Sequence, residues 1–510
     1  MVNWVKGSKL EHPLADDKAN RELLAALPAD DHFRILEELS HWLDSLNGSD
    51  ELKIPRVLEI IELVDQTAKN PVRKLSTDYI IGGARLQKFQ EIRIWNAVFN
   101  YTRKLSDAYQ HCLTRFQEGR DGADAIANQL PVITARTLRG LGVQFKWQYL
   151  RYGPTSPRLR EQLGSIYRFA EEKGLATSKV VVYPGAFGES TIQRETLKSL
   201  MLAMSSTDSL LPNKLHIAER IVAQFSEFFV MQRRAGKGCH FFFDLSSGNL
   251  PARLVSRLEM TPGLRFFGPG TAADELANLI SQVERSGVLP SRINLGGEFD
   301  SEVVLEVLRH LARYWSPIPV ARTSERHKSV FRISVVHNFK ELVAAISGVP
   351  VDASLDNAIE TWTVENESEG GYGALLPFSQ SDWLKIGSLI GVKIEDGAAW
   401  GVGVVRRLSA FDLKQRYVGI QLLSRGGSVV KVSPSDSAGD APQESAVLLP
   451  SNTADSSTSR EMNLLFRRGA CALQKSMDMR AYDREYMLVP RKLIESGDDF
   501  DMFRVRVAQI

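Results

Sequence analysis

Phe331-Arg332-Ile333-Ser334-Val335 alternates apolar and polar side chains. This period of two is typical of a β-strand that buries one of its faces. Val418-Gly419-Ile420-Gln421-Leu422 repeats the alternation, and residues 503–507 repeat it near the end of the chain. Short strands separated by glycine-containing turns predict an antiparallel barrel or sandwich in the C-terminal part of the chain.

The chain before residue 317 has a helical period instead. Apolar side chains recur at spacings of three and four over residues 33–46, and again within residues 213–234. Such stripes pack helix on helix. We therefore predict a mainly α-helical region over residues 1–316, as one body or as two subdomains with a break near residues 120–180.

Three short apolar runs interrupt the helical region: Lys179 to Tyr183, His240 to Leu245, and Leu264 to Phe267. Turn residues follow the second and third runs, which marks where each run ends. The residues leave two alternatives open, because the runs suit either the strands of a small sheet or extended connectors inside a helical domain.

The last part of the chain returns to the pattern of strands, so residues 426–510 predict a further small β domain. Ser, Asp, Ala, Thr and Pro dominate near 433–443 and 451–460, and we expect mobile loops there. The predicted fold class is α+β multidomain, in which the helical region precedes a barrel over residues 317–425 and this small β domain.

Charge and hydropathy exclude several classes of protein. Lys and Arg number 63 against 61 Asp and Glu, a net charge of +2, which argues against a broad nucleic-acid binder. The binding of a small anionic ligand by a few local arginines remains an open alternative. Met1 to Leu10 has no long apolar core, and no stretch approaches the roughly 18 apolar residues of a membrane span. We expect a cytoplasmic protein.

The three cysteines are Cys112, Cys239 and Cys471. An odd and widely spaced set is no disulfide framework and indicates a reducing compartment. His111 and His240 lie beside two of them, but the spacing of a zinc site is missing. We predict buried thiols and no metal.

Two short motifs carry the chemistry. Arg322-Thr323-Ser324-Glu325-Arg326 places two arginines four residues apart, and Asn366-Glu367-Ser368-Glu369-Gly370-Gly371 reads N-x-S-x-x-G where a strand meets a turn. In this order, before the later strands of a barrel, they make the sequence resemble the PilZ domain family, the bacterial receptors for cyclic di-GMP. The resemblance covers about residues 320–425. It departs from the family in the 40-residue gap from Arg326 to Asn366, where residues 338–348 read as an inserted short helix or loop.

The resemblance implies a PilZ-like β-barrel that binds cyclic di-GMP, with no other cofactor. The ligand-binding residues that it implies are Arg322, Arg326, Asn366, Ser368 and Gly371. Secondary candidates are Arg332, Gly370, Arg406 and Arg407.

Elementary chemistry agrees with this ligand. A guanidinium fork pairs with the O6 and N7 acceptors of guanine, or stacks on a base. From Ala321 to Arg332 four cations and one acid give a local charge of +3, and the even numbering of Arg322, Arg326, Lys328 and Arg332 would place them on one side of an extended segment. The alternative remains that the arginines are solvated or paired with acids, and that N-x-S-x-x-G is an ordinary Asx-type turn.

Signatures of catalysis are missing. Gly296-Gly297-Glu298-Phe299-Asp300 looks like the Gly-Gly-Asp-Glu-Phe signature of diguanylate cyclases, but it is one acid short and precedes a helical pattern, for which Asp300 or Ser301 is a natural N-cap. No phosphate-binding loop, dinucleotide fingerprint, zinc-protease or nucleophile-elbow motif occurs. We therefore predict a protein without catalytic residues.

The function that we predict is a cyclic di-GMP receptor in which the ligand changes the arrangement of the helical region and the barrel, or their contact with a protein partner of the helical region. Two alternatives stay open. One is an interaction scaffold whose barrel binds no nucleotide, and the other is an enzyme within residues 120–310 that the barrel regulates.

Overall fold

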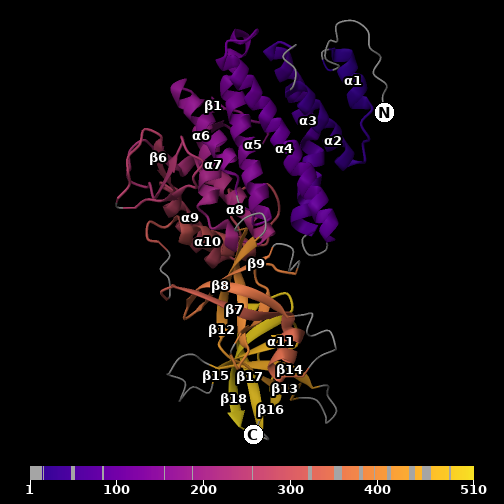
Figure 1. Cartoon of the computed structure of the whole chain (residues 1–510), viewed down its shortest axis with the longest axis vertical. Coiled ribbons are helices and arrows are strands. Elements are labelled where there is room, and N and C mark those ends of the chain that lie inside the picture. The colour runs from indigo at the N-terminus through magenta and orange to yellow at the C-terminus, as the bar shows by residue number, and fades with distance from the viewer. Residues whose placement is uncertain are drawn as a thin grey trace. The chain divides into compact units, whose positions relative to one another are not determined.

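A computed structural model describes residues 14, 16–47, 52–82, 86–153, 155–185, 188–255, 257–319, 324–349, 359–377, 383–395, 397–410, 415–435, 443–450, 461–481 and 484–509. The chain divides into two compact units, Met1–Val320 and Ala321–Ile510. The first is indigo to magenta in Figure 1, and the second is orange to yellow. None of the described helices is long and apolar enough to cross a membrane.

The first unit is mainly helical, as predicted. The helix over residues 33–46 is confirmed, whereas the helix predicted within residues 213–234 ends earlier, at Gln224, where a 3-10 turn and then a strand follow. The helices of this unit are α1 (Asp17–Ala25), α2 (His32–Asn47), α3 (Ile54–Gly82), α4 (Lys88–Gln117), α5 (Leu130–Leu150), α6 (Pro157–Glu172), α7 (Ile192–Ala203), α8 (Pro212–Gln224), α9 (Ala272–Ser286) and α10 (Ser301–Trp315), with short 3-10 turns at Asp124–Gln129, Thr207–Ser209 and Ser226–Phe228.

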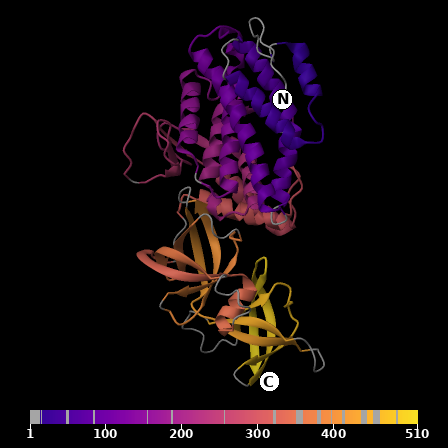
Figure 2. The same ribbon diagram turned by 45° about the vertical axis from the view of Figure 1, so that its right-hand side comes forward.

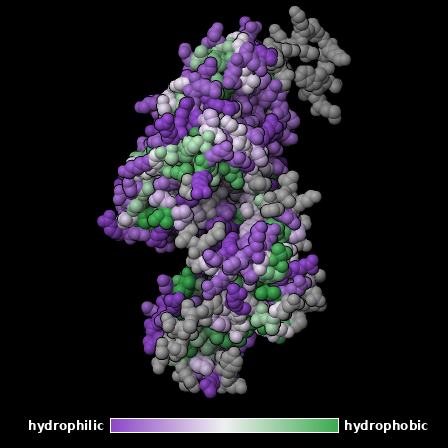
Figure 3. Space-filling view, turned by 60° about the vertical axis from the view of Figure 1, so that its left-hand side comes forward, coloured by the Kyte–Doolittle hydropathy of each residue, from purple (hydrophilic) through white to green (hydrophobic). Residues whose placement is uncertain are grey.

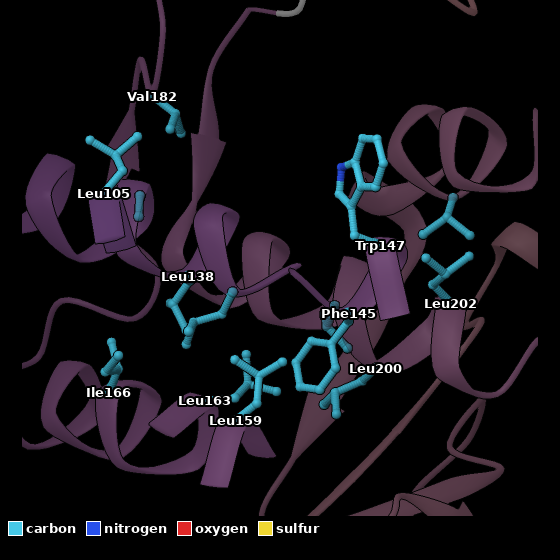
Figure 4. Close-up of a cluster of buried hydrophobic side chains, with 14 of the residues drawn as sticks. Leu105, Leu138, Phe145, Trp147, Leu159, Leu163, Ile166, Val182, Leu200 and Leu202 are labelled. Atoms are coloured by element: carbon cyan, nitrogen blue, oxygen red, sulfur yellow. The ribbon is translucent and has the colours of Figure 1, made fainter. Parts of the chain in front are cut away.

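Helix α5 is the central helix of this unit, since α4, α6, α7 and α8 all pack against it. Figure 4 shows Leu138 and Phe145 of α5 among leucines of α6 and α7. Burying each such side chain contributes about 1.5–3 kcal/mol. A Cβ at Gly140 would lie 2.1 Å from Ser106 Oγ, so this glycine permits the close approach of α4.

A buried ion-pair cluster joins α5 to α7. Arg139 donates two hydrogen bonds of 2.9 Å to the carboxylate of Glu195, and Lys198 Nζ donates another at 2.7 Å. Burial alone would raise the pKa of Glu195, but the charges of Arg139 and Lys198 outweigh it and lower that pKa to about 2.

The three apolar runs separate into two cases. Residues 241–244 and 264–268 form strands of a four-stranded antiparallel sheet, so the small-sheet alternative holds for the second and third runs. The first run forms only the two-residue strand β1, which pairs with β2. The strands are β1 (Lys179–Val180), β2 (Ser190–Thr191), β3 (Val230–Gln232), β4 (Phe241–Asp244), β5 (Ala252–Arg253) and β6 (Leu264–Gly268), and the order in the sheet is β3-β6-β4-β5.

Two smaller predictions about the chain can be compared with the structure. Asp300 accepts hydrogen bonds from the backbone of Glu302 and Val303, so its N-cap role at the start of α10 is confirmed. Cys112, Cys239 and Cys471 are buried free thiols, also as predicted. On the face in Figure 3, hydrophilic side chains cover most of the helical unit, with small hydrophobic patches among them.

The second unit contains two closed antiparallel barrels of six strands each, which confirms the predicted α+β multidomain class. Closure removes free sheet edges from both barrels. The first barrel has the order β10-β11-β12-β9-β8-β7 and the second β13-β14-β15-β18-β17-β16. Their strands are β7 (His327–His337), β8 (Glu360–Ser368), β9 (Gly371–Pro377), β10 (Leu389–Ile394), β11 (Gly401–Ala410), β12 (Gln415–Ser424), β13 (Ser428–Pro434), β14 (Glu444–Leu449), β15 (Glu461–Arg467), β16 (Met477–Ala481), β17 (Arg484–Ser496) and β18 (Phe500–Gln509). The loops predicted near 433–443 and 451–460 fall largely on residues 436–442 and 451–460, outside the described residues.

The insertion between the two motifs is a helix, α11 (Asn338–Ser347), which packs against strands of both barrels. Figures 1 and 2 show it between the orange and the yellow strands. Its Phe339 and Leu342 belong to an apolar cluster that also contains Val404 of the first barrel and Phe500 of the second. The inserted helix thus gives the two barrels a shared core, which accounts for the long gap in the sequence.

Polar contacts reinforce this junction between the barrels. The guanidinium of Arg406 on β11 donates hydrogen bonds of 2.5 and 2.7 Å to the two carboxylate oxygens of Glu495 on β17. The backbone N–H of Phe339 donates to Asp499 Oδ2 at 2.5 Å.

Candidate functional site

The two motifs lie at the same end of the first barrel. The register of β7 and β8 pairs His327 with Glu367 and Lys328 with Asn366, so the segment that carries Arg326 runs beside the N-x-S-x-x-G strand. A Cβ placed on Gly370 would have Ser324 Oγ as its nearest neighbour, at 4.0 Å. Residues of both motifs therefore lie close together, while Arg322 falls outside the described residues.

Tyr417 on β12 connects the motifs. Its hydroxyl oxygen accepts a hydrogen bond of 3.0 Å from Asn366 Nδ2 and another of 3.4 Å from Arg326 Nη1. No motif in the sequence pointed to Tyr417, because its strand begins almost fifty residues after Asn366 and its alternation indicated only a strand. The tertiary structure adds it to the site.

Gly373 on β9 makes room for this contact. A Cβ at this position would lie 2.0 Å from the Tyr417 hydroxyl oxygen and 2.7 Å from Asn366 Oδ1. Real Cβ atoms essentially never lie within 3.0 Å of another heavy atom, so a larger residue would displace one of the two groups. Gly373 is a second residue that the motif analysis missed.

One polar atom of the site has no hydrogen-bond partner among the described residues: Asn366 Oδ1 is buried and unpaired. A buried acceptor left unpaired costs about 1–3 kcal/mol, and such groups are rare in folded proteins. The amide of Asn366 is thus held by Tyr417 on its nitrogen, and its oxygen has no partner among the described residues.

Two hydrogen bonds hold the turn between β8 and β9, one within the turn and one from β12. Ser368 Oγ donates to the carbonyl of Gly371 at 3.3 Å, and the backbone N–H of Leu422 donates to the carbonyl of Gly370 at 2.9 Å. A Cβ at Gly371 would lie 1.9 Å from the carbonyl oxygen of Ile420, so this glycine lets β9 approach β12.

The secondary candidates lie in different surroundings. Arg406 forms an ion pair with Glu495, and its Nε also donates a hydrogen bond of 2.7 Å to Gln421 Oε1. Arg332 and Arg407 are exposed on β7 and β11. Gly370 lies in the turn, beside Ser324.

The prediction that the even-numbered cations lie on one side of an extended segment is wrong for the part of this segment that the structure describes. Between Lys328 and Phe331 the register with β8 shifts, so that Lys328 faces Asn366 whereas Arg332 faces Thr363. The additional residue in β7 interrupts strict alternation. Lys328 therefore stays with the site and Arg332 leaves it.

A closed six-stranded antiparallel barrel with arginine before its first strand and N-x-S-x-x-G between its next two is a PilZ domain. The C-terminal part of the chain thus contains a PilZ domain, and a family model of such a domain matches there. Residues 18–235 match the N-terminal domain of the cyclic-di-GMP receptor FimW, and residues 350–428 match its middle PilZ domain. The matched family is thus a family of cyclic di-GMP receptors. A comparison with curated proteins finds no match.

The matched ranges leave part of the chain uncovered. The arginine motif, residues 322–326, precedes the PilZ match, and residues 429–510 follow it. The second barrel is therefore a structural finding that the family models do not describe.

Proposed function

We propose that this chain is a receptor that binds cyclic di-GMP at the end of the first barrel where β8 meets β9. The observation that carries the proposal is the Tyr417 hydroxyl, which hydrogen-bonds to Arg326 of one motif and to Asn366 of the other. Two motifs that are 40 residues apart in the sequence thus form one constellation.

The groups present suit the two parts of the ligand. The exposed guanidinium of Arg326 pairs with the O6 and N7 edge of a guanine or with a phosphate. Asn366 Oδ1 is buried and unpaired among the described residues, and a turn of this side chain would let it accept a hydrogen bond from a guanine N–H donor. Ser368 supplies a hydroxyl, and Arg322 and Gly371 complete the proposed set.

The open side of the turn lets the ligand approach the backbone. Among the described residues, only Ser324 Oγ, at 4.0 Å, lies near a Cβ placed on Gly370, so that no described side chain fills the space beside this residue. Lys328 faces Asn366 and adds a positive charge for the phosphates. Of the secondary candidates, Arg407 pairs with Gly419, which lies beside Gly373 in the same cross-strand row as Asn366. Arg332 and Arg406 are outside this constellation.

The output of binding is part of the proposal. Arg322 and Arg326 follow directly after Val320, where the first unit ends. A ligand that orders this segment acts on the connection between the units, provided that it binds one arrangement better than another. We place this receptor in the cytoplasm and propose that the helical unit contacts a protein partner.

Isothermal titration calorimetry with cyclic di-GMP tests the proposal. We expect the wild type to bind with a dissociation constant of about 1 μM or lower, and Arg326→Ala to weaken binding at least about tenfold. Arg480→Ala, which removes an exposed arginine from the second barrel, is the matched control and should leave the affinity unchanged. Absence of heat with the wild type would contradict the receptor and favour the scaffold that binds no nucleotide.

A further inference from the structure

The outer face of strands β15, β18 and β17 in the second barrel has two halves. In one half, Leu465, Phe500 and Met502 belong to the core shared with the first barrel. Strands β18 and β17 continue beyond that core, and there their outward side chains are exposed. The exposed half is therefore continuous with the junction between the barrels.

Four cations occupy the exposed half: Arg491, Lys492, Arg504 and Arg506. Arg504 and Arg506 alternate along β18, and Lys492 lies directly opposite Arg504 on β17. Arg491 is the additional residue at a register shift of β17. All four are exposed.

No carboxylate among the described residues forms an ion pair with these four cations. Glu495, the nearest acid along β17, is held by Arg406 of the first barrel. Glu461 lies opposite Arg506 on β15, so one acid borders the group. The exposed half thus carries an excess of positive charge that the described residues do not neutralise.

This charge is unfavourable for the barrel alone. Like charges directly opposite each other on neighbouring strands destabilise a sheet, by up to about 1 kcal/mol for each pair. A cationic row of this kind suits a partner that is acidic.

We propose that this exposed half is a docking surface for an acidic polypeptide segment in extended conformation. Successive outward residues of a strand lie about 6.5–7 Å apart, which is also the spacing of acids at alternate positions of an extended peptide. Both barrels are closed, so an added peptide finds no free strand edge and must be recognised by side chains. The net charge of the chain, only +2, disfavours nucleic acid as the occupant.

The proposal is independent of cyclic di-GMP. It rests on the second barrel, most of which follows the residues that match a PilZ domain. Failure of nucleotide binding would leave it untouched, and failure of peptide docking would leave the receptor proposal untouched.

Fluorescence anisotropy on the full chain tests it, with a labelled peptide of alternating glutamate and threonine as the probe. We expect saturable binding to the wild type at low salt, weakened at least about tenfold in Arg504→Gln/Arg506→Gln and weakened by added salt. Arg480→Gln/Arg484→Gln removes two exposed arginines from β16 and β17 of the same barrel and is the matched control. It should bind the peptide as the wild type does.

Thermal unfolding separates docking from a structural role. Because Arg504 and Arg506 form no ion pair with a carboxylate of the described residues, the double variant should unfold at the temperature of the wild type or slightly above it. Equal peptide binding by the double variant and the wild type, or no binding by the wild type, would overturn the proposal. Binding of phosphatidylglycerol vesicles or duplex DNA in place of the peptide, lost in the double variant, would also overturn it and assign the surface to that partner.

Discussion

The side-chain amide of Asn366 donates a hydrogen bond of 3.0 Å to the hydroxyl of Tyr417, a residue 51 positions further along the chain. The same hydroxyl accepts from Arg326, so a residue outside both motifs orients a member of each. In a site that recognises a planar base, orientation decides affinity, since a bidentate contact needs both partners in one plane.

Removing the hydroxyl of Tyr417 should therefore weaken ligand binding. In Tyr417→Phe, Asn366 and Arg326 lose their common acceptor, and we expect an affinity for cyclic di-GMP about five- to tenfold lower, with a loss of stability of about 1 kcal/mol. Calorimetry and chemical unfolding measure the two effects. Tyr372→Phe is the control, because that ring packs against Phe331 in the same barrel. An equal loss in both variants would count against a specific role for Tyr417.

A methyl group at Gly373 should disturb the same contact by a different route. In Gly373→Ala the added Cβ would lie 2.0 Å from the Tyr417 hydroxyl oxygen, so the ring must move and ligand affinity should fall about tenfold. The double variant Gly373→Ala/Tyr417→Phe should bind better than the sum of the single effects predicts, because the clashing oxygen is gone. Gly426→Ala, where nothing lies within 4 Å of the added Cβ, is the control. Strict additivity in calorimetry would refute this account.

The ion pair of Arg406 with Glu495 should stabilise the junction between the barrels and should not affect binding at the ligand site. Both side chains are partly exposed, so we expect Arg406→Ala and Glu495→Ala each to cost about 1 kcal/mol in chemical unfolding. A double-mutant cycle should show coupling of similar size. Affinity for cyclic di-GMP should stay within about twofold in both variants. A tenfold loss in Arg406→Ala alone would instead make this arginine a ligand contact.

The buried carboxylate of Glu195 makes the stability of the helical unit depend on pH. Its pKa is lowered from 4.5 to about 2, so its contribution is complete above pH 4.5 and is lost as the pH falls from there toward 2. Glu195→Gln should lower the free energy of unfolding by about 2–4 kcal/mol at pH 7 and flatten its decline below pH 4.5. Urea unfolding across this range measures both effects. Glu22→Gln, at an exposed position of α1, should show the same dependence of the free energy of unfolding on pH as the wild type. The wild-type dependence in Glu195→Gln as well would contradict the assignment of this effect to Glu195.

Local order is what the amino-acid sequence determined by itself. The alternation around Ile333 is confirmed as strand β7, the stripe over residues 33–46 is confirmed as α2, and Asp300 caps α10 as expected. The motif that contains Asn366 and Ser368 also lies where a strand meets a turn. These features depend on neighbours within a few residues, and side-chain periodicity and capping report on such neighbours directly.

The tertiary structure alone decided which distant groups meet. It joined Tyr417 to Asn366, gave Arg406 a carboxylate partner on another barrel, and moved Arg332 away from Lys328 through one register shift. It also turned the inserted α11 into a core that two closed barrels share. The physical reason is that strand register and barrel closure depend on packing across the whole unit. A shift of one residue in the register turns the side chains that follow it to the other face of the sheet, although the local sequence is unchanged.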